Sequence, residues 1–542
     1  MGEHQVQAGE AVDRHGLNKR DRSLLFWASF LSLMACGLGF AFRAMVPHLW
    51  GAEYNVLDAE VGKLFGAGLW PIAIMMILFS LIVDKVGYKA SMMCAFVLQA
   101  ISVVLTFTAS TFNAMWWACI LAGLGHGIVE AVINPLVASI YREEKTKWLA
   151  ILHASWPAGV GAGAAIYMTF FSNAETWGGA KIAWVIMLLP VLAYGVMYLM
   201  CKRFPVDERV EAKVPYTDML KELGGLGAFL AISFVGYELY TQMGLFSTGQ
   251  YTRLLAALGI GAVGGAAFGF AVKSAGRWLF FFLCLLMVPL ATAELATDGW
   301  IQNLMRPTLG KYAGWALAFS SLIMMVLRFF AGIPLKRMGP LGLLLISSVF
   351  SIIGLFALSA ATGVLIFVAF VFYAVGQTFY WPAVLGLTSE QYPKGGALTL
   401  NTVSAMGLLT VGIFGFPFLG AVQDSCDANA VLEAQPAVVE MVKAAQRTSD
   451  EKGQPELIVQ EKVLFGVKYP SINANAIMAQ PEFPEEGKAP LQEEIKNSGR
   501  KTLRVASVLP ITMALGFLAM MIWFKAHGGY KPMHLVDDGE SA

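Results

Sequence analysis

The chain has 542 residues, of which 57% are hydrophobic and only 14% are charged, and its formal net charge is +1. A soluble protein carries roughly 25% charged residues, so this composition excludes an ordinary soluble domain and indicates a polytopic membrane protein. The small net charge gives no reason to expect a nucleic-acid partner. The six cysteines form no CxxC pair, so neither a disulfide framework nor a metal site is expected.

Apolar stretches of roughly 20 residues, long enough to cross a bilayer as helices, follow one another along the whole chain. Six begin before residue 200, two occupy about 226–246 and 253–272, and six follow, beginning near residues 277, 312, 341, 364, 396 and 503. The sequence therefore predicts an all-α polytopic membrane protein of about 14 spans. We expect a six-helix half at 1–200, a cytoplasmic linker with two extra transmembrane helices at 201–275, and a second six-helix half at 276–542.

The distribution of charge gives the expected orientation. With the N-terminus in the cytoplasm, the inside loops hold fifteen lysines and arginines and the short outside loops hold two, as the positive-inside rule requires. We expect a multi-pass protein of the cell inner membrane with both termini cytoplasmic. The polar stretch at about 422–502 would lie outside, as a small helical cap or a partly disordered loop. The glycine-rich run at 259–269 predicts close packing of the two extra helices at the periphery.

Polar side chains inside one apolar stretch are the strongest sign of a functional site. His126, Glu130 and Asn134 recur at a spacing of four, so they share one face of a helix. A carboxylate at bilayer depth costs at least roughly 3 kcal/mol, so such a face usually lines a bundle interior or an aqueous cavity. The pattern predicts a proton or substrate site, with a role in helix packing alone as the alternative.

Two loops at corresponding places in the two halves share a pattern. SLIVDKVGYK (80–89) and AGIPLKRMGP (331–340) each place a small residue, then basic residues, then a glycine at a tight turn. Two six-helix halves with such an internal repeat are typical of transporters.

The first of these loops resembles the cytoplasmic signature of the major facilitator superfamily, between its second and third helices. The match is through Asp84, Gly87 and Lys89, while Ser80 stands where a glycine is usual. The resemblance implies that these residues and Lys85 lock helices together and so act in gating. A basic turn anchored at the membrane surface is the alternative.

A narrower resemblance is to the fucose permease-like sugar:proton symporters. In their fourth helix a glutamate is followed four residues later by Asn-Pro, as Glu130 and Asn134 are arranged here. AELATDGWI (293–301) is similar to their seventh helix through Glu294 and Trp300. This resemblance implies a sugar substrate and proton coupling, and it does not extend to the two extra helices or the outer loop.

One position departs from that family. Its members carry an aspartate near the end of the first helix, four residues before a proline, and here the residue four before Pro47 is Arg43. An arginine does not deprotonate in a protein, so the proton coupling that the resemblance implies cannot be carried over to this chain unchanged. If Arg43 reaches the cavity, we expect it either to pair with Glu130 or Glu294 or to hold an anionic substrate.

The candidate residues fall into three groups. For proton coupling we expect Glu130 first, with Glu294 and His153, because such groups can titrate near neutral pH in a half-dry cavity. Arg328, in the eighth helix of the twelve, is expected to pair with a carboxylate, either in a gate or as a structural ion pair. A sugar needs hydrogen-bonding groups beside aromatic planes, and the substrate-binding candidates are Arg43, His126, Asn134, Trp156, Gln377, Tyr380, Trp381 and Asn401.

Three of these candidates are spaced at i, i+3 and i+4, namely Gln377, Tyr380 and Trp381. This spacing would place them on one face of the tenth helix of the twelve. Ordinary packing of aromatic side chains near a membrane interface is the alternative.

These observations favour a secondary active transporter that moves a small polar solute, above all a sugar, with proton coupling by alternating access. The alternatives are a proton-linked exporter, uptake of a nucleoside or carboxylate, and a membrane ligand sensor. The chain has no Gly-x-x-x-x-Gly-Lys-Ser/Thr loop, and its outer loop has no histidine, so neither an ATP-driven pump nor an enzyme is expected. The expected partners are the solute, protons and the lipid bilayer, with no cofactor and a monomeric state.

Overall fold

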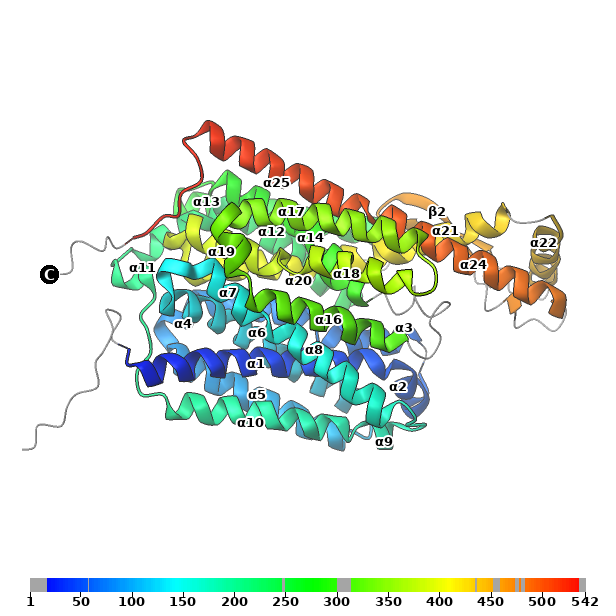
Figure 1. Cartoon of the computed structure of the whole chain (residues 1–542), viewed down its shortest axis with the longest axis horizontal. Helices are drawn as coiled ribbons and strands as arrows, with labels where there is room; N and C mark the ends of the chain where they lie inside the picture. Colours follow the sequence, from blue (N-terminus) through cyan, green and yellow to red (C-terminus); the bar gives the residue numbers. More distant parts are fainter. Residues whose placement is uncertain are drawn as a thin grey trace, which may run out of the picture.

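The computed structural model describes residues 17–56, 58–245, 249–299, 313–433, 436–451, 459–472, 477–478 and 483–535. Within these residues, 13 helices are long and apolar enough to cross a membrane, and the shorter apolar helix Gly314–Phe329 adds one more. The prediction of a helical membrane protein with about 14 spans is confirmed. Figure 1 shows the spans as one bundle, with most of them running along its long axis.

Six spans form the N-terminal half. The helix that carries the predicted polar face begins after Thr111, whose hydroxyl accepts a hydrogen bond from the Ala114 N–H at 3.2 Å. The elements are α1 (Lys19–Met45), α2 (Pro47–Tyr54), α3 (Asp58–Ala67), α4 (Trp70–Val86), α5 (Tyr88–Thr108), α6 (Phe112–Ile140), η1 (Arg142–Glu144), α7 (Lys145–His153), α8 (Ser155–Ile166), η2 (Tyr167–Phe171), α9 (Trp177–Ala180) and α10 (Ala183–Met200).

Glycines allow α1 and α8 to pack with their backbones close together. Gly159 and Gly163, four residues apart on α8, both face α1. A Cβ on Gly159 would lie 2.1 Å from the Met34 carbonyl oxygen, and one on Gly163 would lie 2.8 Å from the Ala41 Cβ. In lipid, where the hydrophobic effect does not drive helices together, such close packing is a principal source of association.

We therefore expect Gly159→Leu to lower the thermal stability of the purified protein. The leucine would force the backbones of α1 and α8 apart, and overpacking of this kind costs roughly 1–3 kcal/mol or more. Gly259→Leu, on the apolar helix 250–272, is the matched control, because no atom of the described residues lies within 4 Å of a Cβ placed on Gly259. Melting in detergent, followed by size-exclusion chromatography, measures the effect. Equal losses in the two variants would contradict this account of the α1–α8 contact.

The linker and the two extra helices follow. They comprise α11 (Glu208–Glu211), α12 (Tyr216–Gln242) and α13 (Gln250–Val272). The buried residues of α13 are Ala257, Gly261 and Gly265, and a Cβ on Gly265 would lie 2.8 Å from the Gly225 carbonyl oxygen of α12. The predicted close-packing glycine face is confirmed, and most of the surface of α13 points outward from the bundle.

The C-terminal half mirrors the first. The eighth and ninth of the twelve spans are joined within α17 at Gly339, which has a φ of 64°. Gly87, with a φ of 84°, makes the turn at the corresponding place in the first half. The elements are α14 (Trp278–Ala291), η3 (Thr292–Ala296), α16 (Ala313–Phe329), α17 (Gly332–Ala360), α18 (Leu365–Gln377), α19 (Tyr380–Gln391), η5 (Pro393–Gly395), α20 (Gly396–Thr410), η6 (Val411–Gly415), α21 (Phe416–Leu432) and α25 (Val508–Ala526).

Between α21 and α25 the chain forms a small mixed cap rather than a purely helical one. Its elements are α22 (Pro436–Glu451), the antiparallel strands β1 (Val459–Leu464) and β2 (Val467–Ile472), and α24 (Glu485–Ala506). An apolar cluster holds it together, formed by Ala428, Val431, Val442, Ile472, Ile477, Phe483 and Leu491. The cap therefore has its own core.

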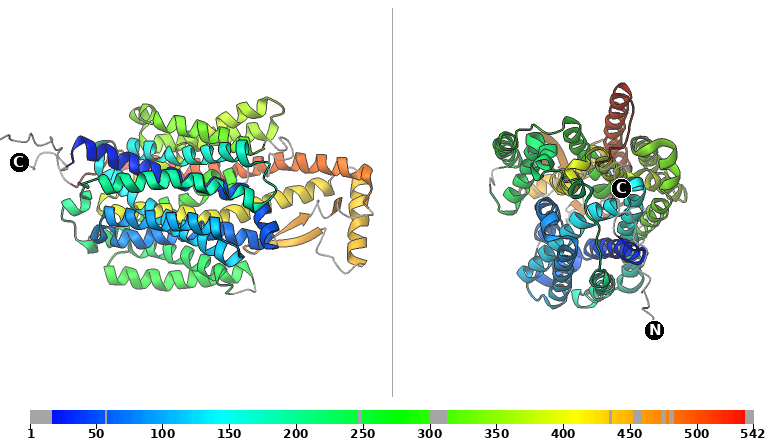
Figure 2. Two further views of the ribbon diagram at one scale, coloured as in Figure 1. Left: turned by 90° about the horizontal axis from the view of Figure 1, so that it is seen from below. Right: turned by 90° about the vertical axis from the view of Figure 1, so that its left-hand side faces the viewer.

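The cap and the linker lie at opposite ends of the bundle. In Figures 1 and 2, α22 and the strands extend from one end, whereas α11 and the segment that follows α25, up to residue 535, lie at the other. We call these the cap end and the linker end. Seen along the spans, α25 stands on the outside of the bundle (Figure 2, right).

Candidate functional site

The polar face of α6 forms a hydrogen-bonded cluster with the end of α7. Asn134 donates from Nδ2 to Glu130 Oε2 at 3.0 Å, and Asn134 Oδ1 lies 2.8 Å from His153 Nε2. His126 Nε2 is 3.8 Å from Glu130 Oε1. All four side chains are buried. The predicted common face of His126, Glu130 and Asn134 is therefore present, and His153 joins it from the next span.

Arg328 connects this cluster to the C-terminal half. Its guanidinium donates to Glu294 Oε1 at 2.7 Å, to the Thr378 carbonyl at 2.6 Å and to the His153 carbonyl at 2.8 Å. Arg328 lies where its span is interrupted, because α16 ends at Phe329 and helix resumes at Gly332. The carboxylate partner predicted for Arg328 is thus Glu294, and the pair is fully buried, with exposures of 1% and 2%.

A small cavity lies between the two halves beside this ion pair. It is narrow, with free room for about one water molecule. The ring of Trp156 lines it and also stacks on His126, with ring centroids 5.4 Å apart, so the cavity wall contacts the α6 cluster. The lining residues are Phe40, Trp156, Pro157, Val160, Glu294, Leu295, Asp298, Leu317, Ser321 and Met324.

Asp298 belongs to this cavity although it was not among the predicted site residues. Its Oδ1 accepts a hydrogen bond from Gln377 Nε2 at 2.9 Å. The signal available in the sequence was its position four residues after Glu294, which brings two acidic side chains of one span near each other. Trp300, the other residue matched in that stretch, lies outside the described residues.

The predicted common face of Gln377, Tyr380 and Trp381 is not formed. The helix is interrupted between α18 and α19, with Phe379 at φ −104° and ψ 2°, and the three side chains meet different neighbours. Gln377 reaches Asp298, the Tyr380 hydroxyl donates to the Ser347 carbonyl at 3.5 Å, and Trp381 packs against Gly407 of α20. Of the three, Gln377 is the one bonded to a residue that lines the cavity.

Asn401 joins the two halves of the molecule. Its Nδ2 donates to the Ala131 carbonyl of α6 at 3.0 Å, and the side chain is fully buried. This bond ties α20 of the C-terminal half to the helix that carries the polar cluster.

Arg43 lies apart from the central cavity, and the pairing with Glu130 or Glu294 that was expected if it reached that cavity is not formed. Glu294 is bonded to Arg328, and Glu130 is bonded to Asn134. Arg43 leaves α1 at its end, passes close to Gly68, and lines a second cavity inside the N-terminal half.

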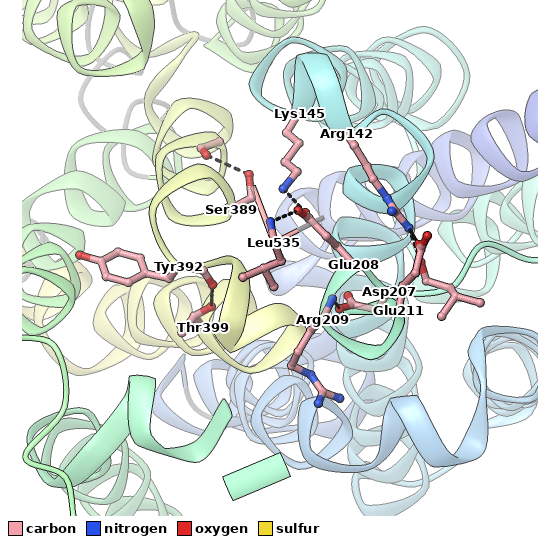
Figure 3. A network of polar contacts seen from close by, with 12 residues as sticks. Arg142, Lys145, Asp207, Glu208, Arg209, Glu211, Ser389, Tyr392, Thr399 and Leu535 are labelled. Atoms are coloured by element: carbon pink, nitrogen blue, oxygen red, sulfur yellow. Dashed lines mark hydrogen bonds and ion pairs between the residues drawn. The ribbon is translucent and has the colours of Figure 1, made fainter. Parts of the chain in front are cut away.

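Charged contacts hold the linker against the N-terminal half at the linker end. Lys145 Nζ lies 2.6 Å from Glu208 Oε2, and Arg142 Nη2 lies 2.5 Å from Glu211 Oε2. Figure 3 shows Lys145 and the backbone N–H of Leu535 converging on Glu208 from different elements; the Leu535 N–H donates to Oε1 at 2.8 Å.

The loop that matched the superfamily signature also contacts the linker. Asp84 pairs with Arg209, and Lys85 Nζ lies 5.4 Å from the centre of the Tyr216 ring. Lys89 Nζ donates to the carbonyls of Leu199 and Cys201 at 3.1 and 3.0 Å, where α10 ends. Together with the turn at Gly87, these residues fix both ends of the linker segment.

The C-terminal segment crosses the same end of the molecule. The Tyr530 hydroxyl donates to Glu390 Oε2 at 2.6 Å, and the Met533 N–H donates to the Glu390 carbonyl at 2.8 Å. Glu390 also accepts a hydrogen bond from Thr146 of α7. Since Leu535 is bonded to Glu208, this segment joins α19, the linker and the N-terminal half.

Asp207 in the linker makes this end sensitive to pH. Burial raises its pKa to about 6, and the negative charge of Asp84 adds to the effect. A raised folded-state pKa gives stability that is complete below the ordinary value near 3.8 and is lost as the pH rises through about 6. Glu208 is also partly buried, but Lys145 lowers its pKa, so Glu208 stays ionised across this range.

We therefore expect Asp207→Asn to be more stable than the original protein near pH 7, with the difference shrinking as the pH falls below about 6 and disappearing only near 3.8. The reason is that asparagine, like the protonated acid, carries no charge to be buried. Melting temperatures of both proteins across this range test the prediction. The half-exposed Asp218, changed to asparagine, serves as control. A constant difference between Asp207→Asn and the original protein at every pH would contradict it.

Comparisons with known proteins agree with this architecture. Residues 25–301, half of the chain, match the model of the Major Facilitator Superfamily. A gentisate transporter of Corynebacterium glutamicum is 22% identical over 210 residues, which is 39% of this chain and 46% of that protein. The chain thus matches less than half the length of this relative.

Three solved structures share the fold. A double-tryptophan variant of the proton:xylose symporter XylE gives a TM-score of 0.59 at 13% identity, covering 95% of this chain and 97% of its own. The E. coli fucose:proton symporter FucP gives 0.51 at 13% identity, covering 90% and 98%. The nucleoside transporter NupG gives 0.50 at 11% identity, covering 92% and 99%. At these identities the likeness concerns the fold alone.

Proposed function

Because the chain belongs to the Major Facilitator Superfamily, we propose that it is a secondary transporter that moves a small sugar across the membrane together with protons. The observation that carries this proposal is the cavity between the halves, where the Trp156 ring lies near the carboxyl groups of Glu294 and Asp298. Sugar hydroxyls donate to carboxylates, and the apolar C–H face of a sugar packs on an aromatic ring. The fold shared with structures described as xylose and fucose symporters is consistent with this substrate class.

Proton coupling is proposed to reside in the α6 cluster. Glu130 is buried and bonded to Asn134, which is bonded to His153, and the His153 carbonyl accepts from Arg328. Protonation of Glu130 removes the negative charge of the hydrogen-bond acceptor in this series of contacts. The series runs from the N-terminal half to Arg328 in the C-terminal half. Glu294 is the second candidate proton carrier, since it lines the cavity and holds Arg328.

Alternating access then means rocking the two halves about this centre. Opening the linker end requires breaking the contacts of Glu208 with Lys145 and Leu535 and those of Glu390 with Thr146 and Tyr530. In this proposal the signature loop acts as a gate through the Asp84–Arg209 pair, and the linker end faces the cytoplasm of a cell whose inner membrane contains the protein.

The proposal is tested by uptake of labelled monosaccharides into proteoliposomes, with the outside made acidic. We expect one monosaccharide to accumulate under the proton gradient but only to equilibrate without it. Trp156→Ala is expected to raise KM strongly, because it removes the aromatic wall of the cavity. Trp117→Ala, at a position 58% exposed on the lipid-facing surface, is the matched control. Transport of another solute class with no monosaccharide transported would overturn the sugar assignment.

Uptake of an aromatic carboxylate is the second candidate function. One observation favours it, the partial likeness to a gentisate transporter. The same assay with gentisate in place of sugar distinguishes the two. Export would appear as efflux from preloaded vesicles, and a sensor would bind its ligand without flux.

A further inference from the structure

Arg43 is a buried positive charge with no counter-charge among the described residues. Its side chain is 5% exposed, and no described carboxylate forms an ion pair with it. A guanidinium stays protonated in a protein, and removing an unpaired ion from water costs several kcal/mol. The native state therefore requires something else to neutralise it.

The cavity beside Arg43 offers unused hydrogen-bond donors. Arg43 Nε and Trp50 Nε1 are both buried and have no acceptor among the described residues. The cavity has free room for about one group of the size of a water molecule. It has no carboxylate among its lining residues, which are Arg43, Trp50, Ser102, Thr106, Met115, Ala118, Cys119, Ala122, Trp184 and Met187. A fixed positive charge and a second N–H donor in an otherwise mainly apolar wall fit an acceptor that carries negative charge.

We propose that this cavity binds a small anion, either a carboxylate group or an inorganic ion of the size of chloride. The anion neutralises Arg43 and accepts hydrogen bonds from Arg43 and Trp50. The site is separate from the cavity between the halves, because the two share no lining residue. It therefore does not depend on which solute crosses the membrane.

The test is saturable anion binding by the purified, full-length protein in detergent. Chloride and formate are each titrated against protein prepared in a buffer of large organic anions, and calorimetry and melting temperature are both read. We expect saturable binding and stabilisation by at least one of them. Arg43→Gln should abolish this response, while Arg277→Gln, which removes a more exposed arginine, should leave it unchanged.

Trp50→Phe keeps an aromatic ring at this position and leaves the Arg43 charge in place, but it removes the Trp50 Nε1–H donor. It should weaken anion binding roughly tenfold, the effect of one hydrogen bond to a charged group, and it keeps the test decisive if Arg43→Gln does not fold. Binding of chloride alone identifies an inorganic occupant, and formate binding that displaces chloride identifies a carboxylate. Both outcomes support the site. No saturable response to either anion, or identical responses in the original protein and Trp50→Phe, would overturn it. Sugar uptake is measured separately, so its failure would leave this result intact.

Discussion

Arg328→Met is expected to abolish transport and to destabilise the protein substantially. The substitution leaves the Glu294 carboxylate buried without its partner, and breaking a buried ion pair in this way costs about 3–5 kcal/mol. It also removes the hydrogen bond to the His153 carbonyl, one of the direct links between the two halves at the cavity. Proteoliposome uptake and melting temperature measure the two losses.

The double variant Arg328→Met with Glu294→Met separates the two effects. Removing both charges should recover much of the stability, because well-packed apolar residues often replace a buried pair at little cost, but transport should stay absent. Arg337→Met, at an exposed position, is the control for loss of an arginine. Full transport by the double variant would show that the pair is only structural.

Glu130→Gln is expected to eliminate proton-driven accumulation while preserving exchange of solute across the membrane. Glutamine keeps the shape of the side chain and can still accept a hydrogen bond from Asn134, but it cannot bind and release a proton. Accumulation should therefore fall to the equilibrium level, whereas counterflow of labelled against unlabelled solute should continue.

Glu53→Gln, at an exposed position on α2, is the matched control and should behave as the original protein. Accumulation by Glu130→Gln at the original level would remove Glu130 from the coupling mechanism. Loss of counterflow as well as accumulation would indicate that Glu130 positions the solute instead.

The sequence was sufficient to predict the spans and the polar face of α6. Both depend on local rules: an apolar stretch of bilayer length forms a span, and residues at a spacing of four share a helix face. The charge of Arg328 inside an apolar stretch also predicted a carboxylate partner, since an unpaired ion is costly there.

What could not be predicted depends on contacts between distant segments or on weak local signals. The sequence alone did not show that Arg43 points into its own cavity, or that Leu535 meets Glu208. The interruption between Gln377 and Tyr380 carries no strong breaker before Pro382, so the expected helix face failed. The β1–β2 turn uses Phe465 and Gly466 at φ 48° and 90°, where asparagine or aspartate before glycine is the usual signal.

The most direct test of the whole account is proton movement during solute entry, followed with a pH-sensitive dye outside proteoliposomes. Adding the transported sugar should make the outside more alkaline, because each sugar would enter with a proton, and Glu130→Gln should give no pH change. Entry of the sugar into vesicles containing the original protein without any change in outside pH would contradict proton coupling and the role assigned to the α6 cluster.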